Sequence, residues 1–101
     1  ARLRAEAEAN FEAATALAAN WRQAEQAALA LEESARLAAR AYALGEGGLD
    51  AVLTARRLAQ EGRLQERQTR VAALAADARL KLDAHALWPL DADADGAHVH
   101  P

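Results

Sequence analysis

The 101-residue sequence contains no cysteine and no methionine, only two prolines and only four aromatic residues. Without cysteine the chain forms neither disulfides nor thiolate metal sites, and its redox compartment stays open. So little aromatic bulk fills a globular interior poorly. Charges of both signs are interspersed and the net charge is −3, which leaves no basic patch for nucleic acid or for a membrane surface.

Residues for catalysis are also missing. Ser34 is the only serine, and it lies far in sequence from any histidine. The glycine-rich stretch near residue 45 lacks the Lys-Ser/Thr ending of a phosphate-binding loop. No apolar run approaches the roughly 18 residues of a membrane-spanning helix. We therefore expect no enzymatic activity and no cofactor.

What the sequence has in abundance is alanine, with 31 residues, and residues 1–44 contain neither glycine nor proline. Apolar residues recur there at the a and d positions of a coiled coil, which predicts one long packed helix. One column holds Ala7, Ala14, Trp21, Ala28, Ala35 and Tyr42, and the other holds Leu3, Asn10, Leu17, Ala24, Leu31 and Ala38. On the outer surface, Glu32 and Arg36 have the favourable i, i+4 order of an ion pair.

A second helix is predicted from about residue 49 to about residue 86, with one internal glycine, Gly62. Eleven-residue spacings within its apolar stripe predict a nearly straight helix. The stripe consists of Leu49, Val52, Leu53, Leu58, Ala59, Leu64, Val71, Leu74, Ala75, Ala78 and Leu82. The section from Glu61 to Arg70 is polar, so we expect a narrow contact there, with Glu66–Arg70 and Asp77–Lys81 as outer ion pairs.

Between the two helices lies a turn at residues 45–48 with three of the five glycines. Gly45 suits the left-handed conformation that ends a helix, and Asp50 suits the start of the next one. A short turn between arms of similar length predicts an all-α fold, a long antiparallel helical hairpin or coiled coil over 1–88. Because alanine buries little area, we also expect lateral association with further helices.

Residues 89–101 form an acidic, irregular C-terminal tail, which begins where Pro89 ends the helical pattern. His98 and His100, with His85 at the end of the second helix and three aspartates between, are a candidate zinc, copper or nickel site. Such spacing is also typical of a solvated terminus that binds no metal.

The segment from Ala41 to Arg57 resembles the helical turn near the C-terminus of outer-membrane efflux proteins, the TolC-like family. That pattern has Tyr, two residues, Gly, a short turn, Leu, an acidic residue and an apolar pair, here Tyr42, Gly45, Leu49, Asp50, Val52 and Leu53. Leu87-Trp88-Pro89 looks like the end of the last helix in the heavy-metal-efflux branch. The pattern departs at Gly47 and Gly48, where bulkier or polar residues are common.

The resemblance implies that the chain is a fragment of the periplasmic α-helical barrel of an outer-membrane protein, a trimer when full-length. It implies that the tip residues dock a periplasmic adaptor protein, which joins the duct to an inner-membrane pump that exports metal ions or small molecules. The implied tip residues are Tyr42, Gly45, Glu46, Gly47, Gly48 and Leu49. Two alternatives remain from the residues themselves, namely a generic coiled-coil interaction module and a small periplasmic metal-binding helical protein.

Overall fold

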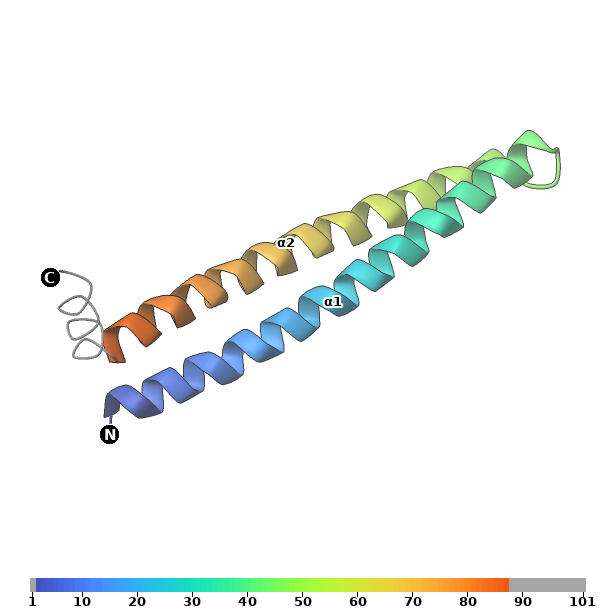
Figure 1. The fold of residues 1–101 in the computed structure, drawn as a ribbon. Coiled ribbons are helices and arrows are strands. Elements are labelled where there is room, and N and C mark those ends of the chain that lie inside the picture. The colour runs from blue at the N-terminus through green and yellow to red at the C-terminus, as the bar shows by residue number, and fades with distance from the viewer. Residues whose placement is uncertain (1, 88–101) are drawn as a thin grey trace, which may run out of the picture.

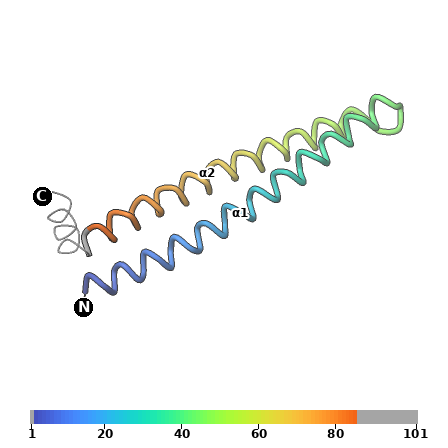
Figure 2. Tube along the Cα trace, viewed as in Figure 1, coloured from blue at the N-terminus to red at the C-terminus, as the bar shows by residue number. Residues whose placement is uncertain are grey.

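The computed structural model describes residues 2–87, which form two long helices joined by one turn. Helix α1 spans Arg2–Ala43 and helix α2 spans Leu49–Leu87. The helices run antiparallel along their whole length, so that the turn lies at one end of the hairpin and the start of α1 and the end of α2 lie at the other (Figures 1 and 2). The predicted all-α hairpin is confirmed for this part of the chain, and the predicted tail lies outside the described residues.

The lengths of the helices follow from local sequence. Helix α1 has alanine at more than a third of its positions and no glycine or proline, so nothing inside it interrupts the backbone hydrogen bonds. It ends where the glycines begin. In α2 the first turn carries Asp50, whose carboxylate is favourable beside the free N–H groups at a helix N-terminus. Two residues beyond its last residue stands Pro89, which cannot continue a helix.

The seam of α1 is the predicted sevenfold ladder over most of its length. From Ala7 to Ala38 every a and d position is buried or half-buried, and Ala28 is fully buried. The two ends of the ladder differ, because Leu3 and Tyr42 are about half exposed, at 52% and 49%. The heptad pattern of α1 therefore identified its contact face, except at its first and last positions.

The seam of α2 was predicted wrongly. Of the eleven residues in the predicted apolar stripe, only Val52 and Ala59 are buried, and the larger members mostly point to solvent. The contact positions instead keep a strict alternation of three and four residues, so α2 has the same heptad pattern as α1. These positions are Val52, Ala55, Ala59, Gly62, Glu66, Thr69, Ala73, Ala76, Leu80 and Asp83.

The reason is complementarity of size across the seam. Where α1 supplies a bulky side chain, at Leu31, the facing position of α2 must be small. A Cβ atom added to Gly62 would lie 2.6 Å from Leu31 Cδ1 and 3.6 Å from Ala28 Cα. The backbones thus approach closely where Gly62 faces α1, and larger residues of α2 are turned outward.

The polar middle of α2 makes a broader contact than predicted. Glu66 is 3% exposed, and its Oε2 accepts a hydrogen bond from Trp21 Nε1 at 2.9 Å. Arg63 Nη1 lies 3.1 Å from Glu66 Oε1 and Arg70 Nε lies 3.7 Å from Oε2. These donors hold the pKa of Glu66 below its ordinary value, and the hydrogen bond from Trp21 has the largest effect. Glu66 is therefore a buried member of the seam, whereas the sequence placed the Glu66–Arg70 pair outside.

Two further polar contacts connect the helices. Asn10 donates a hydrogen bond from Nδ2 to Asp83, so the single polar residue in the α1 ladder meets a carboxylate across the seam. Arg63 binds Glu32 with two nitrogens, at 2.6 and 3.1 Å. The predicted Glu32–Arg36 pair is thereby corrected, since Arg36 binds Glu33 instead, at 2.6 and 2.9 Å. These cross-helix contacts fix the register of one helix against the other.

Candidate functional site at the hairpin tip and the outer edge of α2

The tip closes with a Schellman motif built on Gly45. The Glu46 N–H donates to the carbonyl of Ala41 at 2.8 Å, and the Gly45 N–H donates to the carbonyl of Tyr42 at 3.0 Å. Gly45 has φ = +75°, and among the described residues no other residue has positive φ. Because a side chain at this φ is strained, Gly45 is the position that requires glycine.

The other two tip glycines are constrained less. A Cβ atom on Gly47 would lie 3.3 Å from the Ala41 Cβ, a tight contact with the end of α1. On Gly48 it would lie 2.5 Å from Asp50 Oδ1, the mobile end of a side chain that can rotate away. Glycine is therefore required at position 45, is favoured at position 47 because it avoids the tight contact with Ala41, and can be replaced at position 48.

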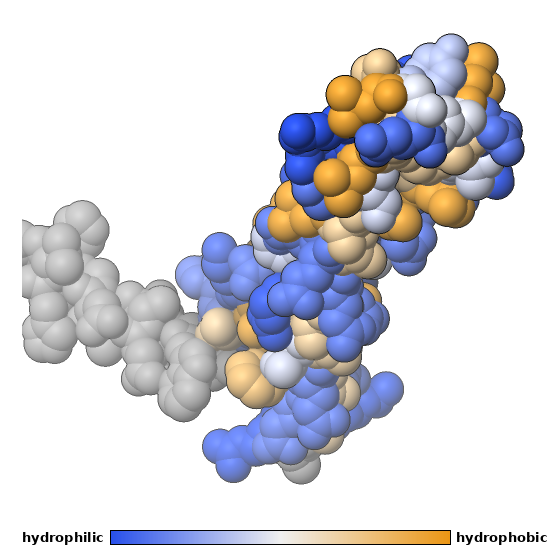
Figure 3. Space-filling view, turned by 90° about the vertical axis from the view of Figure 1, so that its right-hand side faces the viewer, coloured by the Kyte–Doolittle hydropathy of each residue, from blue (hydrophilic) through white to orange (hydrophobic). Residues whose placement is uncertain are grey.

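The tip exposes apolar side chains around this turn. Tyr42, Leu44, Leu49 and Leu53 are between 49% and 62% exposed. Figure 3 views the molecule toward this end and shows hydrophobic residues gathered there, interspersed with hydrophilic ones. Of the implied docking residues, the structure thus brings Tyr42 and Leu49 to the exposed tip, with Gly45, Glu46, Gly47 and Gly48 in the turn between them.

A second apolar surface lies on the side of α2 that faces away from α1, here called the outer edge. Its members are Leu53, Leu64, Val71 and Leu74, which are 56%, 50%, 64% and 59% exposed. The sequence identified these residues as apolar but assigned them to the wrong side. The signal that separates the two sides is the heptad through Gly62 and Glu66, which a search for large apolar residues passes over.

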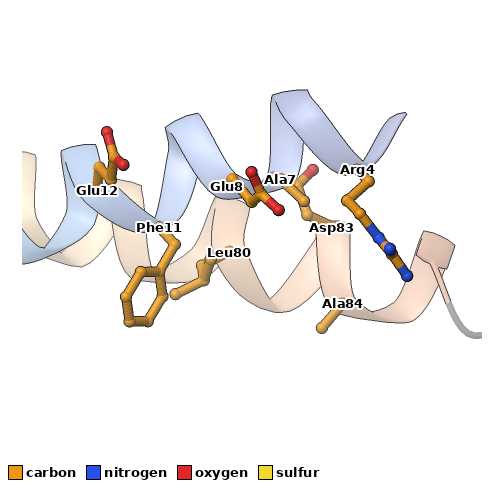
Figure 4. Close-up of a pocket in the computed structure, with 8 residues that line it drawn as sticks. All are labelled: Arg4, Ala7, Glu8, Phe11, Glu12, Leu80, Asp83 and Ala84. Carbon is orange, nitrogen blue, oxygen red and sulfur yellow. The ribbon is translucent and has the colours of Figure 1, made fainter. Parts of the chain in front are cut away.

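A hollow of about 410 Å³ lies at the open end of the hairpin. Figure 4 shows its lining, with Phe11 of α1 beside Leu80 of α2 and Arg4 toward the helix ends. Phe11 is 60% exposed, so this is a shallow groove rather than an enclosed cavity. Its lining includes the charged residues Arg4, Glu8, Glu12 and Asp83, but it is too open to bury most of a small ligand as an enclosed pocket does.

The candidate metal site cannot be assembled from the described residues. His85 is exposed near the end of α2, and His98 and His100 lie outside the described residues. Within residues 2–87 no three histidine, aspartate or glutamate side chains are grouped to hold a metal ion. Neither helix in this range combines the length and apolar character needed to cross a membrane.

Comparisons with known proteins add no identification: no family model, no curated protein and no solved structure matches the chain.

Proposed function

We propose that this chain is a non-catalytic docking hairpin, which works by binding helices of other polypeptides. The observation that carries the proposal is that α2 has a contact face on one side and exposed large apolar residues, interspersed with Arg57, Gln60 and Arg67, on the other. One side is the seam, which α1 covers, and the other is the outer edge from Leu53 to Leu74, which is half exposed or more. A helix with large apolar residues exposed opposite its contact face needs a second neighbouring helix to bury them.

The setting that fits these features is the periplasmic helical barrel of an outer-membrane efflux protein. In a barrel wall each helix has a neighbour on both sides, which is the requirement of α2. The residues that carry the resemblance also adopt the conformation of a tip, because Gly45 caps α1 and Leu49 begins α2. In this setting the hairpin is a passive wall segment of a trimeric duct, and the exported substrate never reacts with it.

The partner of the tip in this proposal is the helical hairpin of a periplasmic adaptor protein. Exposed Tyr42 and Leu49 supply apolar contact area, and the narrow glycine turn between them lets another backbone approach. A generic coiled-coil interaction module is the second candidate, and it is favoured by the same outer edge without any role for the tip.

Binding to an adaptor hairpin separates these candidates. The intact chain is compared with one variant whose residues 45–49 are scrambled and a second variant with Leu64→Glu and Leu74→Glu on the outer edge. The efflux setting predicts that scrambling the tip abolishes binding while helicity is retained. Binding that survives the scrambled tip but is lost in the edge variant would favour the generic module, and no binding across several adaptors would contradict the efflux setting.

A further inference from the structure

The two flanks of the hairpin differ sharply in charge. If Ala28 and Val52 are a positions, the c and g positions from Ala9 to Ala41 in α1 and from Ala51 to Leu82 in α2 define one flank. This uncharged face has two charged residues among twenty, Glu61 and Arg79. The b and e positions on the opposite flank have eleven charged residues among twenty, including the Glu32–Arg63 pair.

Both helices contribute to the uncharged face at the same level. Ala13, Ala72 and Arg79 line one hollow of about 230 Å³, and Asn20, Gln23 and Gln65 line the next along the hairpin. The face is exposed throughout, apart from partial burial of Ala41 and Ala72. Within these bounds the stripe nearly avoids charge, and Arg2 and Glu6 continue the same flank toward the start of α1. So long an uncharged stripe is unusual on a surface in contact only with water.

We propose that two copies of this chain pair through their uncharged faces, antiparallel, with the two tips at opposite ends of a four-helix bundle. The sequence of the face identifies a second copy of the chain as its partner. When a second α2 lies antiparallel to the first about residue 70, the residues that face each other are complementary. A two-fold axis at that level places Leu58 opposite Leu82 of the second copy. The same axis places Glu61 opposite Arg79, so the only two charges on the face form two symmetric ion pairs.

Helix α1 has its own centre of symmetry at the same level. An axis between Asn20 and Gln23 places these two amides opposite each other, and each amide can both donate and accept a hydrogen bond. Beyond them the axis places alanine opposite alanine, Ala16 with Ala27 and Ala13 with Ala30, which allows the helices to approach closely. Asn20, Gln23 and Thr69 line one hollow, so the α1 centre and residue 70 of α2 lie at nearly the same level in the hairpin.

A parallel pair is less favourable for the same charges. With the tips together, α2 would lie over α1 of the second copy at the same level, so that Glu61 and Arg79 would face alanines. Two observations show which part of α1 lies level with Glu61 and with Arg79. Gly62 lies against Ala28, and Ala13 and Arg79 line the same hollow. Glu61 reaches Arg57 of its own helix at 3.2 Å, but this pair is exposed and costs little to rearrange.

The area of the uncharged face is sufficient for a stable dimer. Helical rise and diameter give a strip about 50 Å long and about 20 Å wide, roughly 1,000 Å² per copy, above the roughly 800 Å² that each partner buries in a standard interface. This pairing does not depend on the proposed efflux setting, since it uses neither the tip nor the outer edge.

The first test is the mass of the chain by sedimentation equilibrium, because an elongated hairpin distorts elution volumes. We expect twice the 10.7 kDa of one chain at about 100 µM, where a dimer with micromolar Kd is almost fully formed. Glu61→Arg and Arg79→Glu should each weaken the dimer by about tenfold or more, because like charges then face each other twice. Glu25→Arg on the charged face is the matched control and should leave the mass unchanged.

The decisive experiment mixes the Glu61→Arg chain with the Arg79→Glu chain, each of which forms a weaker dimer by itself. The new arginine of one chain then faces the new glutamate of the other, and the native Arg79 of the first chain faces the native Glu61 of the second. A heterodimer should therefore form at wild-type strength. A spin label on Glu46→Cys should report the two tips far apart, at opposite ends of the bundle. A monomer at about 100 µM, no recovery on mixing, or a short distance between the labels would each overturn the proposal.

Discussion

Trp21 and Glu66 bind each other across the middle of the hairpin, with the indole N–H donating to a carboxylate that is 3% exposed. This contact joins the only aromatic residue of the α1 seam to the only charged residue that is buried in the described part of the chain. Because Arg63 and Arg70 flank the same carboxylate, both of its oxygens have a positive or N–H partner. A shifted register would leave a buried charge without partners, so the contact specifies one alignment of the helices.

Glu66→Gln should lower the melting temperature by several degrees, because the amide still accepts from Trp21 but loses its attraction to Arg63 and Arg70. Trp21→Phe should also destabilise the hairpin, since it leaves the carboxylate without its indole donor. The double variant should be less destabilised than the sum of the two single variants. Thermal melts followed by circular dichroism measure all three, and strict additivity would show that the two side chains do not act together.

Acid should destabilise the hairpin through three carboxylates. Hydrogen bonds from Trp21, Arg63 and Arg36 hold the pKa values of Glu66, Glu32 and Glu33 below their ordinary value of 4.5. The unfolded chain therefore binds more protons than the folded one in that range, and the stabilisation present above pH 4.5 is lost as the pH falls through the lowered folded pKa values.

The measurement for this prediction is the melting temperature between about pH 7 and about pH 2. Glu66→Gln should flatten the acid limb of the curve, whereas Glu25→Gln, at an exposed position, should leave it unchanged. An identical acid limb in the Glu66→Gln variant would contradict the role given to this carboxylate.

Gly45→Ala should destabilise the hairpin by roughly 1 kcal/mol or more, because a Cβ atom at φ = +75° is strained whatever space surrounds it. Gly45→Val should cost more, because it is β-branched. Gly48→Ala is the matched control, since only the mobile Asp50 side chain opposes its Cβ. Chemical denaturation distinguishes the two positions, and equal effects at 45 and 48 would contradict the assigned turn.

Gly62→Leu should destabilise the hairpin by about 1–3 kcal/mol, because the new side chain has no room between Leu31 and Ala28. Gly62→Ala should be much milder, since alanine improves helix propensity and its Cβ is too close only to the end of the Leu31 side chain, while Ala28 Cα lies at an ordinary contact distance of 3.6 Å. Gln60→Leu adds the same side chain at an exposed position and is expected to be nearly neutral. A neutral Gly62→Leu variant would mean that the helices do not approach closely here.

The sequence was sufficient to predict the hairpin, its turn and the α1 seam, because uninterrupted helix formers, a glycine cluster and a sevenfold ladder are local signals. The sequence misplaced the α2 seam because the residue size that fits at each seam position of α2 depends on the α1 residue that faces it. Leu31 and Trp21 of α1 leave room only for Gly62 and for a hydrogen-bonding group at Glu66. A prediction that follows bulk therefore selects Leu64 and Leu74, which the structure turns outward.

The most direct test of the two-sided α2 is to place a lysine on each side in turn. Ala73→Lys enters the seam, where Ala73 is 9% exposed, and Leu64→Lys enters the outer edge, where Leu64 is 50% exposed. We predict that Ala73→Lys abolishes the cooperative thermal transition, while Leu64→Lys leaves helicity and melting temperature almost unchanged. The opposite result, unfolding by Leu64→Lys and tolerance of Ala73→Lys, would show that the large apolar stripe is the seam and would contradict the account.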